Sequence, residues 1–180
     1  SVDGFLVGTS LMRAADPDRA ARRLVFGPTK VCGLTRPEDA AAAAQVGATH
    51  GGLIFAPESP RAVTTARAVD LVRAAPLAWV GVFADQPADQ VARTAATLGL
   101  EAVQLHGDEP PSYAAGLSRP VIKAMSLGTA ASAGEVDRWP AHVMLLLDAY
   151  DQVRRGGTGQ TIDWSAAATI AARRRLMLAG

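Results

Sequence analysis

The sequence predicts a parallel (β/α)8 barrel, and three observations lead to that fold class. Short apolar runs rich in Val, Leu and Ile alternate with amphipathic stretches along the 180 residues, which is the pattern of right-handed βαβ units. The runs do not alternate in polarity, as expected of strands that are buried on both faces. A polar side chain follows most of the runs, and a barrel gathers such side chains at the carboxyl ends of its strands.

The elements follow one another in a regular order. The expected strands are Gly4–Val7, Lys30–Cys32, Gly52–Phe55, Trp79–Phe83, Ala102–Leu105, Val121–Met125, Val143–Leu147 and Leu176–Ala179. Amphipathic helices are expected between them, among others over Pro37–Val46, Thr64–Ala75 and Pro87–Leu98, where Val91, Ala95 and Leu98 recur at helical spacing. A later helix is expected to begin near Trp164, with Asp163 as its cap and the indole ring packed against the core.

An open, doubly wound sheet is the alternative way to arrange such units. A nucleotide-binding sheet of that kind needs a glycine-rich turn after its first strand, and the segment Gly4–Gly8 is too sparse in glycine for this fingerprint. The polar residues at the ends of many strands therefore favour the barrel.

Composition excludes several classes of function. The 18 basic residues nearly cancel the 17 acidic ones, which leaves a net charge of +1 and argues against a nucleic-acid or membrane surface. No apolar run approaches the ~20 residues needed to span a bilayer. The single cysteine cannot form an internal disulfide, so a cytoplasmic location is expected.

Cys32 and Asp148 are the candidate base and acid. Cys32 ends a predicted strand just before a helix start, where a thiol can be held partly as thiolate; the alternative is a small buried apolar residue. Asp148 follows the run Met144–Leu147, and a carboxyl group among apolar neighbours can keep a proton for donation. The alternative role for Asp148 is a helix cap or turn former.

Further candidates lie in the loops. Arg61 can bind a carboxylate at two points, although an ordinary solvated loop arginine is the alternative. His106 can donate a hydrogen bond into the same cavity, or it can be structural, and no second ligand stands at metal-binding spacing. Gly157 and Gly159 belong to a glycine cluster that could cover a ligand with backbone N–H groups, or form an ordinary flexible loop.

Taken together, several blocks resemble phosphoribosylanthranilate isomerase and occur in that family's order over about residues 29–180. The blocks are Lys30–Thr35, Gly51–Phe55, Ser59–Arg61, Val80–Phe83, Ala102–Gly107, Leu147–Asp148, Gly156–Gly159 and Ile162–Trp164. The resemblance implies a TIM barrel of tryptophan biosynthesis that converts N-(5-phosphoribosyl)anthranilate without cofactor or metal. It implies that Cys32 removes the sugar C2 proton, that Asp148 protonates the ring oxygen and that Arg61 holds the anthranilate carboxylate.

The first residues resemble a different enzyme. Residues 1–27 look like the last strand and helix of indole-3-glycerol-phosphate synthase, which some bacteria fuse directly ahead of the isomerase; the isomerase part would then be residues 28–180. In the synthase, Gly8, Thr9 and Ser10 would help to hold a substrate phosphate through backbone N–H groups, and an ordinary strand–helix turn is the alternative.

The isomerase barrel is expected to be incomplete. The chain reaches the seventh isomerase strand near Leu176–Ala179, so the eighth strand and the family's phosphate loops would be missing. The strand Asp3–Val7 could pair in the vacant position, between the first and seventh strands. The competing hypothesis for function is a catalytically silent fragment, or a structural segment that only contacts the synthase domain.

Overall fold

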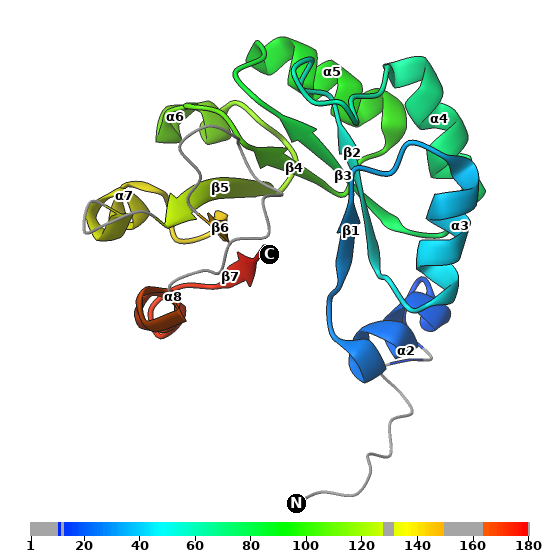
Figure 1. The fold of residues 1–180 in the computed structure, drawn as a ribbon, viewed down its shortest axis with the longest axis horizontal. Coiled ribbons are helices and arrows are strands. Elements are labelled where there is room, and N and C mark those ends of the chain that lie inside the picture. Colours follow the sequence, from blue (N-terminus) through cyan, green and yellow to red (C-terminus); the bar gives the residue numbers. More distant parts are fainter. Residues whose placement is uncertain (1–10, 12, 128–131, 150–163, 180) are drawn as a thin grey trace, which may run out of the picture.

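The computed structural model describes residues 11, 13–127, 132–149 and 164–179, which form a single parallel sheet with helices between the strands. Seven strands pair in chain order, each with the next, so every connection is a βαβ unit. Figure 1 shows that this sheet curls around an interior, with helices on its outer side. The strands are β1 (Lys30–Cys32), β2 (His50–Ile54), β3 (Ala78–Phe83), β4 (Ala102–Leu105), β5 (Val121–Leu127), β6 (Met144–Ala149) and β7 (Leu176–Leu178).

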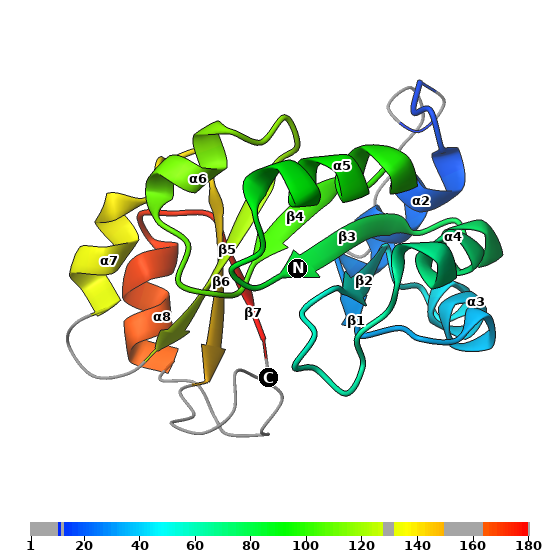
Figure 2. The ribbon, with the colours of Figure 1, turned by 90° about the horizontal axis from the view of Figure 1, so that it is seen from above.

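The helices begin where the sequence offers caps or prolines. Pro17, Pro37 and Pro111 occupy first helical positions, where the missing N–H costs nothing. Asp16 accepts a hydrogen bond from the Arg19 amide at 2.9 Å, and Thr64 caps its helix in the same way. Figure 2 shows the helices that follow the strands placed around the outside of the sheet. The helices are α2 (Pro17–Phe26), α3 (Pro37–Gln45), α4 (Thr65–Ala74), α5 (Ala88–Leu98), α6 (Pro111–Ala115), α7 (Ser132–Arg138) and α8 (Trp164–Ala171).

Side chains of the strands from β3 to β7 divide between two cores. The larger core lies between sheet and helices and includes Leu53, Leu105 and Leu145, all fully buried. The smaller core fills the interior of the curl and is formed by Val80, Ala102, Ile122, Ala124 and Leu146. Because side chains alternate along a strand, every second residue of β1, β4 and β6 must face the interior.

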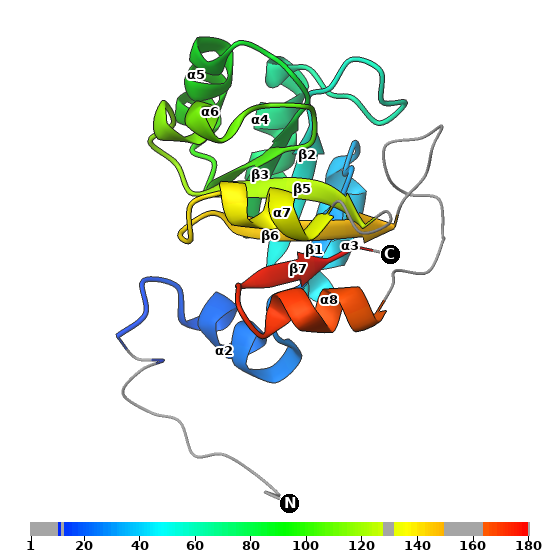
Figure 3. The same cartoon turned by 90° about the vertical axis from the view of Figure 1, so that its left-hand side faces the viewer.

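A contact across the interior shows how strongly the sheet curls. The Lys30 Nζ on β1 donates to the Gln104 Oε1 on β4 at 2.9 Å, although these strands are three positions apart in the sheet. At the other end, Figure 3 shows α7 in front of β5 and β6, with α8 beside β7. Among the described strands, β1 and β7 each pair with a single neighbour, so this part of the molecule is an incomplete barrel.

Seven of the expected strands are confirmed, with changes at their ends. The pairing of β5 with β6 continues through Ser126 opposite Asp148, so both strands run two residues further than expected. The expected first strand, Gly4–Val7, lies outside the described residues. No helix in the described parts is long and apolar enough to cross a membrane.

The expectation that Trp164 packs against the core is wrong. Trp164 is the first residue of α8 and is 62% exposed, so the indole ring is not part of either core. Its expected cap, Asp163, lies outside the described residues.

Candidate active site

Cys32 ends β1 and faces the interior of the curl. The preceding residue, Val31, packs into the outer core, so the alternation of side chains turns Lys30 and Cys32 inward. Cys32 is a free, half-buried thiol and is not part of either core, which removes the alternative of a buried apolar residue. A Cβ at Gly52, its neighbour on β2, would lie 2.8 Å from the Cys32 Sγ, so this glycine leaves room for the thiol.

Arg61 lies beside Cys32, at the carboxyl end of β1. The loop after β2 folds back along that strand, because the Val63 amide donates to the Ile54 carbonyl at 2.8 Å. From this loop the Arg61 Nη1 donates to the Cys32 carbonyl at 3.0 Å. Gly33 makes the approach possible, since a Cβ there would lie 2.6 Å from Nη1. Arg61 is exposed, yet it is anchored at the candidate base and does not extend freely into solvent.

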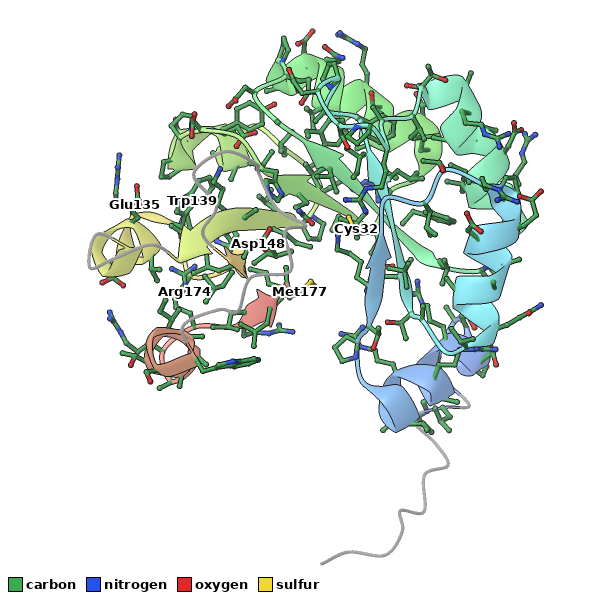
Figure 4. All side chains as sticks on the ribbon, in the orientation of Figure 1. Cys32, Glu135, Trp139, Asp148, Arg174 and Met177 are labelled. Atoms are coloured by element: carbon green, nitrogen blue, oxygen red, sulfur yellow. The ribbon has the colours of Figure 1, made fainter. Side chains whose placement is uncertain are left out.

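Asp148 approaches the same interior from β6. Its neighbour Leu147 packs in the outer core and Leu146 in the inner one, so Asp148 faces inward. Asp148 as a residue is only 8% exposed, and its place within β6 rules out the alternative of a helix cap or turn former. Figure 4 shows Cys32 and Asp148 on opposite flanks of the curled sheet.

His106 lies between these flanks, directly after β4. Its amide donates to the Phe83 carbonyl at 2.7 Å, and its Nδ1 is 3.0 Å from the Gln104 Nε2. Burial lowers the pKa of His106 below the usual 6.5, while the negative charge of Asp148 opposes that change. The Asp148 carboxylate is thus close enough to His106 to influence its pKa electrostatically.

A buried ion pair, which the sequence analysis missed, holds the loops around His106. The Lys123 Nζ lies 2.8 Å from the Glu109 Oε2, and both side chains are almost fully buried. Glu109 also accepts hydrogen bonds from the Asp85 amide at 2.9 Å and from the Gly107 amide. One carboxylate thus joins the loops after β3 and β4 to β5. A charged residue within a strand as apolar as β5 was the signal that could have identified Lys123.

Other predicted residues cannot be placed. Gly157 and Gly159, and the predicted phosphate ligands Gly8, Thr9 and Ser10, lie outside the described residues. Within the described ranges, no three His, Cys, Asp or Glu side chains come together as a metal site would require.

The parallel sheet presents a thiol, an imidazole and a carboxylate at the carboxyl ends of β1, β4 and β6. Barrel enzymes carry their catalytic groups at this end, so the fold and the candidate site are typical of the class of (β/α)8 barrel enzymes. The match to a known family is more specific. Residues 29–180 match the family "N-(5'phosphoribosyl)anthranilate (PRA) isomerase", and the chain belongs to this family.

Relatives agree with this assignment. The tryptophan biosynthesis protein TrpCF of Vibrio cholerae is 41% identical over 99% of this chain and 38% of its own length. The N-(5'-phosphoribosyl)anthranilate isomerase of Pelobacter propionicus is 39% identical over 84% of this chain and 73% of its own length. The structure of phosphoribosyl anthranilate isomerase from Thermotoga maritima superposes with a TM-score of 0.77 at 30% identity, covering 85% of this chain and 76% of that one. The chain spans only 35–38% of the length of the TrpCF relatives.

Proposed function

We propose that the protein containing this chain isomerises N-(5'-phosphoribosyl)anthranilate to 1-(2-carboxyphenylamino)-1-deoxyribulose 5-phosphate in tryptophan biosynthesis. The observation that carries this proposal is the convergence of Cys32 and Asp148 on one interior face, in a chain that belongs to the isomerase family. The reaction is an internal redox rearrangement, so it consumes no oxidant or reductant and needs only proton transfers.

Each proton transfer has one candidate residue. Asp148 gives its proton to the ring oxygen as the bond between that oxygen and C1 breaks, which leaves a protonated Schiff base with the anthranilate nitrogen. Cys32 removes the proton from C2, and the resulting enolamine tautomerises to the ketone. Acid and base act on two different atoms, the ring oxygen and C2, on either side of C1. Their positions on β6 and β1, on opposite flanks of the interior, support this division of roles (Figure 4).

Arg61 is proposed to hold the anthranilate carboxylate. Its guanidinium has one N–H group on the Cys32 carbonyl, and the remaining donors are sufficient for a paired hydrogen bond to a carboxylate. His106 would contribute a hydrogen bond to the substrate, and Gly157 and Gly159 would cover it with backbone N–H groups. Gly8, Thr9 and Ser10 are proposed, from the resemblance alone, as phosphate ligands.

We also propose that this chain is the isomerase part of a bifunctional protein. The family match begins at residue 29, after α2, and the TrpCF relatives are much longer than this chain. A cytoplasmic indole-3-glycerol-phosphate synthase domain, a decarboxylating lyase, would then precede it. A phosphorylated sugar with an anthranilate group is the proposed substrate, and neither nucleic acid nor membrane is a proposed partner.

The test is a fluorescence assay that follows consumption of phosphoribosylanthranilate. It compares this chain with a longer chain that continues through the eighth strand of the family's barrel, each with its Cys32→Ala variant as control. We expect turnover by the longer chain and very weak turnover by this one, because phosphate binding helps to position the reacting sugar. Absence of turnover in both would support the competing hypothesis of a silent or purely structural segment. Robust turnover by this chain would show that the additional loops are unnecessary.

A further inference from the structure

A chain of three polar side chains crosses the interior of the curled sheet below the candidate site. The Lys30 Nζ donates to the Gln104 Oε1 at 2.9 Å, and the Gln104 Nε2 lies 3.0 Å from the His106 Nδ1. Gln104 is 2% exposed, so neither end of its amide can exchange a partner for water. None of these contacts is needed to explain the proton transfers by Cys32 and Asp148.

The direction of these hydrogen bonds is fixed at one end. A lysine ammonium can only donate, so the Gln104 oxygen must face Lys30 and the Gln104 amino group must face His106. The amino group is itself only a donor, and His106 Nδ1 must therefore be an acceptor that carries no proton. Flipping the amide would place its amino group against the ammonium, and protonating Nδ1 would place two donors against each other.

We propose that Gln104 is a positioning residue that, oriented by Lys30, holds His106 as the neutral imidazole with its proton on Nε2. His106 then offers an N–H donor, and no positive charge, to the site that it shares with Asp148. The proposal rests on the proposed function for its consequence. A positively charged ring would make the site less suited to a proton donor such as the proposed Asp148.

The other charges around His106 support a neutral ring. Burial is the largest cause of its lowered pKa; Lys123 on β5 and Lys30 on β1 lower it further, whereas Asp148 on β6 and Glu109 in the loop after β4 raise it. The two carboxylates would favour an imidazolium if they acted alone. The donor contact from Gln104 opposes them at the ring nitrogen itself.

The first measurement is the tautomer of His106 in the unaltered chain. Long-range proton–nitrogen correlation NMR separates a protonated ring nitrogen from a bare one by a large difference in 15N shift. The sequence has three histidines, so His50→Gln and His142→Gln variants assign the remaining signals without changing the polar chain. We expect a bare Nδ1 and a protonated Nε2 for His106 at neutral pH. A protonated Nδ1 would overturn the proposal.

Two variants disturb the hydrogen bond to the His106 Nδ1 in different ways. Gln104→Glu keeps the size of the side chain but replaces the amino group that faces His106 with an oxygen, which can only accept. We therefore expect a protonated Nδ1 and an upward shift of the His106 titration. Lys30→Met removes the ammonium that orients the amide, and the 15N shifts of His106 should move to intermediate values as both tautomers become populated. Lys30→Arg keeps a donor and should retain the original pattern. An unchanged His106 spectrum in both Gln104→Glu and Lys30→Met would contradict the proposal.

The NMR experiment tests the tautomer of His106 independently of the isomerase assay, which tests the proposed function. The NMR signals report the side chain in this chain whether or not it turns over substrate, so an inactive chain leaves the tautomer measurable. In the longer chain, Gln104→Glu should lower kcat about tenfold or more with a smaller change in KM, because it changes the protonation of His106 and leaves Arg61, the proposed partner of the substrate carboxylate, in place. A Gln104→Glu variant with altered His106 tautomer but normal kcat would refute the consequence for Asp148.

Discussion

Two histidines at opposite ends of the sheet are similar in burial and different in their partners. His50 begins β2 at the amino end, and His106 follows β4 at the carboxyl end. Burial lowers the pKa of both. The Nδ1 of His50 lies 2.7 Å from the Thr49 hydroxyl, which also bonds to both the carbonyl and the amide of Thr29. The network at His50 therefore ends on the main chain that leads into β1.

The network at His106 consists of side chains instead. Gln104 and Lys30 reach it from two strands, and the charge of Asp148 acts on it from a third. Side chains that interact only with one another can be arranged for a ligand without disturbing the backbone. In barrels of this kind the carboxyl end of the sheet carries chemistry and the amino end carries stability. The comparison predicts that substitutions at the two ends separate activity from stability.

The largest effect is expected at the carboxyl end. Cys32→Ala and Asp148→Ala should each lower kcat by about a hundredfold or more in the active, longer chain, because each removes one proton-transfer group. Thermal unfolding should change little for Cys32→Ala, whose side chain lies outside both cores. Steady-state kinetics with each purified variant checks this. Near-normal turnover of either one would remove that residue from the proposed mechanism.

Arg61→Ala should chiefly raise KM, by roughly tenfold, because a hydrogen-bonded charge pair with the carboxylate forms before the reaction and persists through it. Arg67→Ala is the matched control. Arg67 is also an exposed arginine that donates to a carbonyl after β1, at 3.3 Å from its Nε to the Thr35 oxygen, but it does not contact Cys32. Equal KM values for the two variants would exclude Arg61 as the carboxylate group's partner.

Thr49→Val tests the amino end. Thr49 is 1% exposed, and valine fills almost the same space without the hydroxyl. We expect a loss of about 0.5–1.5 kcal/mol in the free energy of unfolding, because the hydrogen bonds of the hydroxyl to Thr29 and His50 are removed. Urea denaturation measures this loss, with the exposed Thr97→Val as control. If Thr49→Val lowered kcat of the longer chain and left its stability unchanged, the assignment of stability to the amino end of the sheet would be wrong.

The smallest expected effect is on the pH dependence of stability. The folded-state pKa of His50 lies below its usual 6.5, so between these two values the unfolded chain binds more protons than the folded one. The contribution of His50 to the free energy of unfolding is therefore complete above pH 6.5, and it is lost as the pH falls through the folded-state pKa. Glu101 opposes this shift, while Arg19, Arg23 and Lys30 add to it.

His50→Gln removes the ionisable group at this position and should make the free energy of unfolding less dependent on pH below 6.5. Urea titrations at several pH values, run beside the unaltered chain, give the slope. The same slope in both proteins would show that His50 does not contribute. His106 should act in the same direction, because burial lowers its pKa as well.

Features that depend on neighbouring residues could be predicted from the sequence. The runs Lys30–Cys32 and Ala102–Leu105 coincide with β1 and β4, because short, mainly apolar segments that are bounded by turn residues favour strands. The ends of β5 and β6 were misplaced because Ser126 and Asp148 are polar. Their backbone groups still pair with each other, and the ladder continues through them.

Parts of the candidate site follow from strand order. Cys32 and Asp148 could be placed at one end of the sheet from sequence, since parallel strands all present their carboxyl ends at the same edge. The family resemblance also assigned Arg61 to the candidate site, as the partner of the substrate carboxylate. Its contact with Cys32 could not be predicted, because that contact depends on the space above Gly33 and on the loop after β2 folding back.

The amino-acid sequence by itself determined the strands, their order and the residues at their carboxyl ends, because these depend on local apolarity and on the single hand of βαβ connections. Only the tertiary structure decided that Lys30 meets Gln104, 74 residues away, and that Glu109 pairs with Lys123 beneath two loops. Those contacts depend on how far the sheet curls and how the loops close. Curvature is set by the packing of the whole molecule, and no local segment of the sequence specifies it.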